Sequence, residues 1–365
     1  MSAVVDLIDA PNDRDYASTL SLCCSAHCIL NVYAARGCSP LELTPSQSLD
    51  VEKVLRAILD ASKICGGTRY VAAAIVLAAG KGDLGSNNVV QGHVGADGDH
   101  VKERLVAPAR DWVNAFLWPF WSAYQHADPL ASQRSQRHAC PQIGSRTKKL
   151  AVWPDNRPST LREEVLMRDN YQCVLKGVMD NDTCRTGRIT TTGVGFRRVV
   201  ATRIIRRSLF PKNDSSPLSQ ISAKIDILQY FAGLSGEAMD ELAASIDTPE
   251  NVITLNRDWH DEFDRFEWCL VPHGVDLSRI HDVFDPDLDE LPELSGQQHY
   301  KFVALEPLDC NTVSNPSDKV TFVNHALPAE RTFKFPNPKL LAIHAAIAHV
   351  LHFSGAGDVF SHITT

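Results

Sequence analysis

The sequence lacks the short signatures of several enzyme classes. It contains no Cys-x-x-Cys pair, no Gly-x-x-x-x-Gly-Lys-Ser/Thr segment and no Gly-x-Ser-x-Gly segment. The first absence argues against a zinc ribbon, and the other two argue against phosphate-binding-loop and serine-hydrolase chemistry. From the residues we expect neither a cofactor nor a bound metal.

Long apolar runs are also absent. The longest candidate, Tyr70–Ala79, is too short to cross a bilayer. The residues after Met1 include no basic region of the kind that opens a signal peptide. We therefore expect a cytoplasmic protein with no membrane partner, in which the 10 cysteines stay reduced. A chain of 365 residues is long enough for a large core and two domains.

Acidic residues are missing from one segment of an otherwise acidic chain. The net charge is -8, which argues against general affinity for nucleic acid, yet residues 185–213 carry eight basic side chains and no acidic one. This segment either binds an anion or is a solvated loop that pairs with acidic surface elsewhere, and the sequence favours neither. Only Phe196 and Phe210 interleave with the arginines, so we do not expect a base-stacking platform.

The most informative segment runs from Asn251 to Asp264. Asn251 opens the apolar run 252–255, which predicts a buried strand, and residues 258–263 predict a short helix that carries His260. Asp264 follows His260 by four residues and so lies on the same helical face. An asparagine on a strand followed by a histidine on a helix is typical of a site in which a base activates water beside a divalent metal ion.

The strand that should supply the general base is altered. By comparison with the protein family that the next paragraph describes, Arg203 stands where a histidine is expected, after Thr202 and before Arg206 and Arg207. A guanidinium stays protonated, so Arg203 cannot act as a general base. It also places a fixed positive charge where a cation would bind. His260 is then the only residual metal ligand, and one imidazole is a poor site for Mg²⁺.

Four segments in this order resemble fungal proteins of the HNH endonuclease family, whose core has the ββα-metal fold. They are Arg168–Gly177, Arg203–Leu209, Asn251–Phe266 and Leu340–Ala356. The resemblance implies a nuclease-like scaffold over roughly residues 159–357, with a degenerate catalytic motif.

The periodicity and turn residues predict an α+β fold. We expect a helical N-terminal region over 1–128, a linker over 129–158, and an HNH-like core with helical insertions and a C-terminal helix over 159–365. Predicted helices are 13–35, 49–64, 70–79, 99–125 with an interruption at Pro119, 161–168, 222–231, 237–245 and 338–352.

Three classes of function remain open. The first is an enzyme that uses the old cleft for metal-free, non-redox chemistry on a small anionic or carbonyl-bearing molecule, such as an isomerase, cyclase or cycloaddition catalyst of fungal secondary metabolism. Its predicted catalytic residues are Arg203, Asn251 and His260, and its predicted substrate contacts are Thr202, Arg206, Arg207, Trp259 and Asp264. The alternatives are a metal-dependent endonuclease and a non-catalytic nucleic-acid-binding protein. The sequence does not specify the oligomeric state.

Overall fold

The computed structural model describes residues 16–37, 40–79, 98–126, 130, 161–175, 177–185, 195–210, 218–272, 297–306, 319–325 and 333–364. Except for Leu130, the predicted linker lies outside these residues. The described elements are helices and small sheets, and they confirm the predicted α+β class. The division into two domains stays a prediction.

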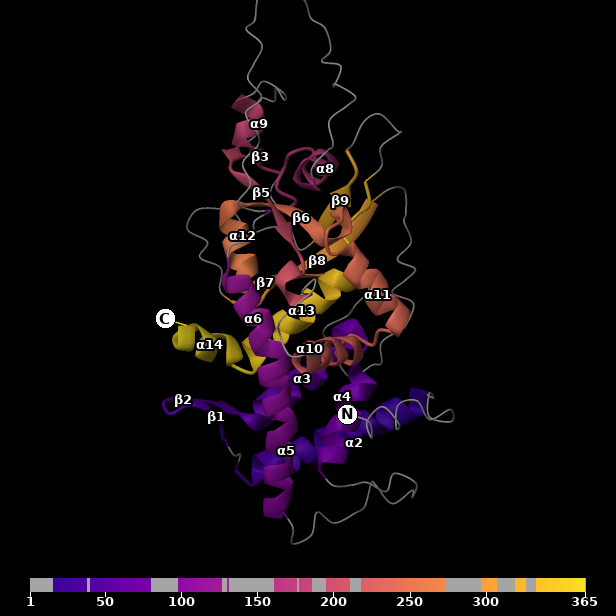
Figure 1. Cartoon of the computed structure of the whole chain (residues 1–365), viewed down its shortest axis with the longest axis vertical. Coiled ribbons are helices and arrows are strands. Elements are labelled where there is room, and N and C mark those ends of the chain that lie inside the picture. Colours follow the sequence, from indigo (N-terminus) through magenta and orange to yellow (C-terminus); the bar gives the residue numbers. More distant parts are fainter. Residues whose placement is uncertain are drawn as a thin grey trace, which may run out of the picture.

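The N-terminal region contains the helices α2 (Tyr16–Ala35), α3 (Val51–Cys65), α4 (Thr68–Ala78), α5 (Gly98–Trp112) and α6 (Trp118–Gln125). They extend from the lower end of the molecule, where α2, α4 and α5 lie, to its middle, where α6 lies (Figure 1). Capping residues set both ends of α3. The Asp50 carboxylate accepts from the backbone N–H of Glu52 and Lys53, and Gly66 ends the helix at φ 100°.

Two predictions in this region are wrong in detail. A hairpin of β1 (Pro40–Thr44) and β2 (Gln47–Asp50) precedes α3, so the predicted helical start at Leu49 falls in a strand. The chain stays helical through Pro119, which lies at the start of α6. The change in helix type comes earlier, in a π-helical turn at Val113–Leu117, where the Trp118 N–H donates to the Val113 carbonyl. Because a proline has no N–H to offer, a local change of hydrogen-bond register keeps the chain helical through this position.

The remaining chain forms small sheets with helices around them (Figure 1). The strands are β3 (Met179–Asp180), β4 (Phe196–Arg197), β5 (Val199–Arg203), β6 (Val252–Asn256), β7 (Trp268–Pro272), β8 (Gln297–Ala304) and β9 (Lys319–Val323). The helices are α8 (Leu161–Arg168), α9 (Asn181–Arg185), the 3-10 turn η2 (Arg207–Leu209), α10 (Leu218–Phe231), α11 (Gly236–Ser245), the 3-10 turn η3 (Pro249–Asn251), α12 (Arg257–Asp264), α13 (Pro338–Phe353) and α14 (Ala356–Thr364).

Strands β5 and β6 pair antiparallel, with Val199 opposite Asn256 and Arg203 opposite Val252. Strands β7, β8 and β9 form a second antiparallel sheet. Helix α12 follows β6 directly, so the described chain contains the predicted strand–strand–helix unit. The long segment between β5 and β6 holds α10 and α11, which are the predicted helical insertions.

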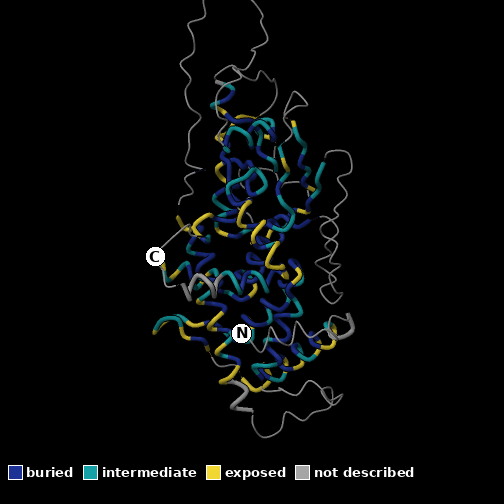
Figure 2. Tube along the Cα trace, turned by 45° about the vertical axis from the view of Figure 1, so that its right-hand side comes forward, coloured by how far each residue is buried: buried dark blue, intermediate teal, exposed yellow. Residues whose placement is uncertain are grey.

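The C-terminal helix α13 lies at the centre of the fold. It packs against α3 and against β7, and every residue from Leu340 to Leu351 is buried. Figure 2 shows this buried interior running from the N-terminal helices to the sheets. One continuous apolar core therefore includes side chains from both regions.

A buried arginine fixes the start of β6. Arg168, fully buried at the end of α8, donates to both carboxylate oxygens of Asp169, at 2.7 and 2.9 Å. Its other N–H groups donate to the carbonyls of Pro249, Val252 and Lys334, at 2.8 to 3.1 Å. All five donors are thus satisfied, as burial of a guanidinium requires.

By length and composition, none of the described helices can cross a membrane on its own. The bent pair α13 and α14 passes that test only when the two are joined, and α13 belongs to the buried core.

Candidate functional site

The candidate site is built on β5, β6 and α12. The Asn256 side chain caps α12 by accepting from the Trp259 N–H at 3.0 Å, which fixes where the helix begins after β6. His260 and Asp264 lie on consecutive turns of this helix. Arg203 ends β5, and the chain then continues through Arg206 into η2.

Asn251 holds the segment after β5 in place. Its side-chain carbonyl accepts from the Ile205 N–H at 2.8 Å, and its amide donates to the carbonyls of Ile205 and Ile246, at 2.9 and 3.0 Å. The residue is fully buried. Asn251 therefore positions the backbone on both sides of the site. We predicted a catalytic role for this residue, and the contacts in the structure are structural ones.

Three polar side chains form the centre of the site. The Arg206 guanidinium forms an ion pair with Asp264 Oδ2, and the same oxygen lies 3.5 Å from Nε2 of His260. The other ring nitrogen of His260, Nδ1, lies 3.2 Å from Asp261 Oδ1. Arg206 also lies over the ring of Tyr124, 4.9 Å from its centroid, as in a cation–π contact. The structure therefore brings together three of the predicted site residues: Arg206, His260 and Asp264.

His260 is neutral at pH 7. Burial lowers its pKa below the usual value, and the positive charge of Arg206 acts in the same direction, whereas the hydrogen bond with Asp261 opposes them. A neutral imidazole can accept a proton. The ring is only 5% exposed, so any ligand that reaches it must enter a nearly closed space.

Arg203 and Arg207 form a second cluster. Arg203 Nη2 lies 3.2 Å from Asp247 Oδ1, and Arg207 Nη1 lies 2.9 Å from Asp247 Oδ2. Asp247 lies in the turn between α11 and η3. The side chain of Arg203 is almost buried, whereas that of Arg207 is half-exposed. Asn251 connects the two clusters because it binds Ile205 and Ile246, one residue from Arg206 and Asp247 respectively.

The other two predicted contacts are core residues. Thr202 is fully buried in β5. Trp259 is buried, and its ring packs edge-on against Trp268 and Phe302, with centroids 5.9 and 5.7 Å apart. These positions give both side chains a packing role, and a contact of either with substrate stays a prediction.

Sequence reasoning missed Tyr124, Asp247 and His344. The Tyr124 hydroxyl donates to the Ile204 carbonyl, beside the centre of the site. His344 of α13 is stacked on Phe263 of α12, with ring centroids 3.8 Å apart and an interplanar angle of 5°. Complete burial lowers the pKa of His344 to about 3. The sequence placed Tyr124 and His344 on the predicted helices 99–125 and 338–352, but no spacing connects either residue to β5.

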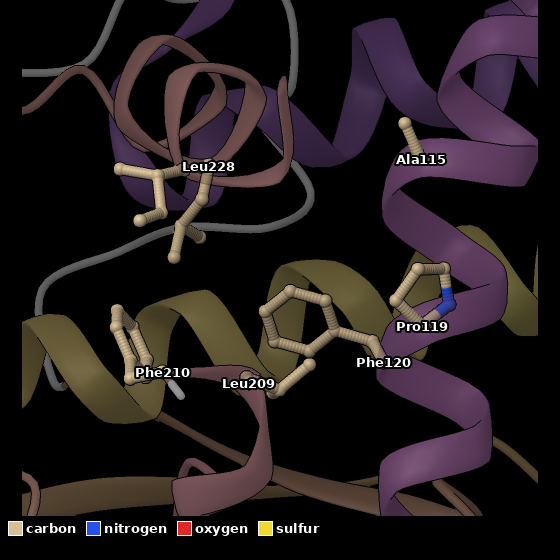
Figure 3. Close-up of a pocket in the computed structure, with 7 residues that line it drawn as sticks. Ala115, Pro119, Phe120, Leu209, Phe210 and Leu228 are labelled. Atoms are coloured by element: carbon tan, nitrogen blue, oxygen red, sulfur yellow. The ribbon is translucent and has the colours of Figure 1, made fainter. Parts of the chain in front are cut away.

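A small apolar hollow lies near the site but outside it. Figure 3 shows its lining side chains, which come from the π-helical turn and α6, from η2 with Phe210, and from α10. The empty space between these side chains is about 260 Å³, part of which is open solvent. It contains none of the predicted catalytic residues.

A model of the HNH endonuclease family matches residues 209–271. The chain therefore carries an HNH-like segment, which includes β6, α12 and the polar residues from Asn251 to Asp264. The matched range begins after Arg203, so the altered first half of the motif stays a prediction. The fungal resemblance also stays a prediction. No curated protein and no solved structure matches the chain.

The HNH scaffold implies a divalent metal ion, and the residues at this position do not fit one. Asp264, the carboxylate beside Nε2 of His260, is already paired with a guanidinium, and that charge would repel a second cation. Within the described residues, no three His, Cys, Asp or Glu side chains gather as a metal-binding group. We therefore derive no chemical step through a metal.

Proposed function

We propose that this chain is an HNH-like protein that does not cleave nucleic acid. On this proposal, the remodelled site performs metal-free, non-redox chemistry on a small molecule with an anionic or carbonyl group. The family match supports the scaffold, and the residues around β5 and α12 support the change of chemistry.

One observation carries the proposal: Asp264 Oδ2 is shared between the Arg206 guanidinium and the Nε2 edge of His260. A fixed organic cation thereby takes the place beside the carboxylate and imidazole that a metal ion would need. The guanidinium stays charged, so it balances the negative charge of Asp264 and no metal ion is needed to do so.

The proposed roles follow from charge and protonation. Burial disfavours the charged form of His260, so its imidazole is unprotonated and available to accept a proton from the substrate. The arginines hold an anionic group or polarise a carbonyl oxygen, since charge-assisted hydrogen bonds are stronger than neutral ones. Asn251 positions the segment that carries Arg206. Isomerisation and cyclisation need no more than proton transfer and charge stabilisation, so these are the reaction types that we propose.

The proposal is tested first by an assay for nuclease activity. The purified protein, incubated with plasmid or single-stranded DNA and Mg²⁺ or Mn²⁺, should leave the DNA intact. A panel of small carboxylates, phosphate esters and carbonyl compounds is then screened in chelator by thermal unfolding. We expect a compound that stabilises the wild type but not His260→Gln. Cleavage of DNA that is lost in His260→Ala would contradict the proposal.

A second function is favoured by one surface feature. Phe196 is 42% exposed in β4, and the adjacent Arg197 and Arg198 are exposed as well. An exposed aromatic ring beside two arginines suits contact with single-stranded nucleic acid, which supports a non-catalytic binding protein. The test is fluorescence anisotropy with labelled oligonucleotides. Binding that weakens in Phe196→Ala and in Arg197→Ala but not in Arg206→Met would favour this alternative.

A further inference from the structure

Asp247 occupies a site made by two arginines. Each of its carboxylate oxygens contacts a different guanidinium, Oδ1 that of Arg203 at 3.2 Å and Oδ2 that of Arg207 at 2.9 Å. Two guanidiniums around one carboxylate is an arrangement that also binds free carboxylates and phosphates. The Asp247 side chain therefore stands in for an anionic ligand, and without it the pair carries two positive charges.

This cluster is open to solvent on one side. The side chain of Arg207 is 49% exposed and that of Asp247 is 34% exposed, whereas that of Arg203 is 11% exposed. The half-exposed guanidinium of Arg207 therefore meets solvent directly, whereas that of Arg203 is largely covered and lies against Asp247.

The backbone around Asp247 is fixed on both sides. The Thr248 N–H donates to the Ser245 carbonyl at 3.0 Å, and the Asn251 amide donates to the Ile246 carbonyl at 3.0 Å. The movable part of this segment is thus the partly exposed side chain of Asp247, rather than its backbone.

We propose that Arg203 and Arg207 form a binding site for the phosphate or carboxylate group of a small molecule, and that Asp247 is a built-in competitor for that site. The inference deepens the proposed function and rests on it in taking the ligand to be a small anion. Because Asp247 is attached to the protein, a weak or singly charged anion competes poorly with it. Asp247 thereby selects for ligands of higher charge.

The experiment measures binding of inorganic phosphate by calorimetry, in low salt with chelator present. Asp247→Asn removes the competing charge and keeps the size of the side chain. We expect this variant to bind phosphate at least about tenfold more tightly than the wild type, which corresponds to about 1.4 kcal/mol. Adding Arg207→Ala to Asp247→Asn should abolish the gain.

Asp240→Asn is the matched control. Asp240 is exposed on α11 and its loss changes the net charge by the same amount, so it reports any general electrostatic effect. We expect phosphate affinity within about twofold of the wild type. Circular dichroism and thermal unfolding check each fold. If Asp247→Asn does not fold, the test is Arg207→Ala alone. Phosphate should then raise the unfolding temperature of Arg207→Ala less than that of the wild type.

Equal phosphate affinity in Asp247→Asn and Asp240→Asn would overturn the inference. So would a gain that survives Arg207→Ala, or, where Asp247→Asn does not fold, stabilisation by phosphate that Arg207→Ala leaves unchanged. The measurement uses neither DNA nor turnover, so its failure is distinct from that of the proposed function. Phosphate binding as expected, together with DNA cleavage by the wild type, would retain the anion site and reject the proposed function.

Discussion

Arg206 and Asp264 are joined by an ion pair that connects the segment after β5 to the last turn of α12. Both side chains are largely buried, at 3% and 15% exposure. The guanidinium also lies over the Tyr124 ring, so it links α6 to the site. This pair explains how a strand–strand–helix unit keeps its geometry with an arginine where a metal ion would otherwise neutralise the carboxylate.

Arg206→Met should destabilise the protein by about 3 kcal/mol, because it leaves the Asp264 carboxylate buried and uncompensated. The free energy of unfolding is measured by chemical denaturation. Asp264→Leu added to Arg206→Met should recover most of the loss, since no buried charge then remains. Arg265→Met is the control. Its half-exposed ion pair with Glu267 should contribute less than about 1 kcal/mol. Equal losses in the two single variants would show that Arg206 has no special role.

His344 should make the protein sensitive to acid. Burial lowers its pKa in the folded state from 6.5 to about 3, so between these values the unfolded state binds more protons. Stability is therefore greatest above about pH 6.5 and falls as the pH decreases toward about 3. From pH 7 to pH 5 we expect His344 to account for a loss of about 2 kcal/mol.

The measurement compares unfolding free energies of the wild type and His344→Phe at both pH values. Phenylalanine keeps an aromatic ring against Phe263 and does not titrate. The variant should lose less stability on acidification. A residual slope should remain, because burial also lowers the pKa values of His260 and His349. An unchanged pH dependence in His344→Phe would contradict the assignment.

Gly67→Ala should destabilise the fold by roughly 3 kcal/mol or more. A β-carbon at Gly67 would lie 2.0 Å from the carbonyl oxygen of Phe231, which is backbone of α10 and cannot rotate away. Gly236→Ala is the control, since a β-carbon there meets no atom within 4 Å, and it should change stability by less than about 1 kcal/mol. Similar thermal unfolding of both variants would mean that the turn after α3 does not pack on α10 as described.

Local signals in the sequence predicted the elements that carry the site. The apolar run after Asn251 identified β6, and the polar residues after it identified α12 within one residue at each end. The partners of the site residues were not predictable in this way. Asp247 lies 44 residues from Arg203, and Tyr124 lies 82 residues from Arg206. Tertiary packing brings them together, and no periodicity or spacing encodes such a contact.

The sequence also predicted a single site that contains Arg203, Asn251 and His260. The structure shows two polar clusters on either side of Asn251, one around Asp264 and one around Asp247. The physical reason is the charge of two aspartates on different elements. Asp264 pairs with Arg206, and Asp247 pairs with Arg203 and Arg207, so the arginines at and after the end of β5 are divided between them. Which arginine pairs with which aspartate depends on the packing of α11 and α12, and neither position follows from the order of residues.

The last prediction restores the family pattern at the altered strand. The segment Arg203–Leu209 resembles a family segment that reads His-Ile-Ile-Pro at its first four positions. Arg203→His and Arg206→Pro together replace both guanidiniums with the residues that this resemblance implies. The backbone permits the second change, because Arg206 has φ −69° and ψ 134°, and φ is close to the value that proline requires. Arg206→Pro removes the ion pair of the Asp264 carboxylate with a guanidinium, beside His260. Arg203→His introduces a second imidazole at the end of β5. We therefore expect the double variant to bind Zn²⁺ or Mn²⁺ more tightly than the wild type.

Calorimetry with each metal and analysis of metal content provide the measurement. The gain should disappear when His260→Ala is added, since that imidazole is the ligand on α12. Arg203→His with Arg206→Met separates loss of charge from the effect of proline, and it should show the same gain. If the double variant folds but binds no more metal than the wild type, the two arginines are not what prevents metal binding, and the site differs from the family's in some further residue. If it also cleaves DNA in the presence of the metal, the nuclease chemistry was lost through these two positions, because no other part of the chain was changed.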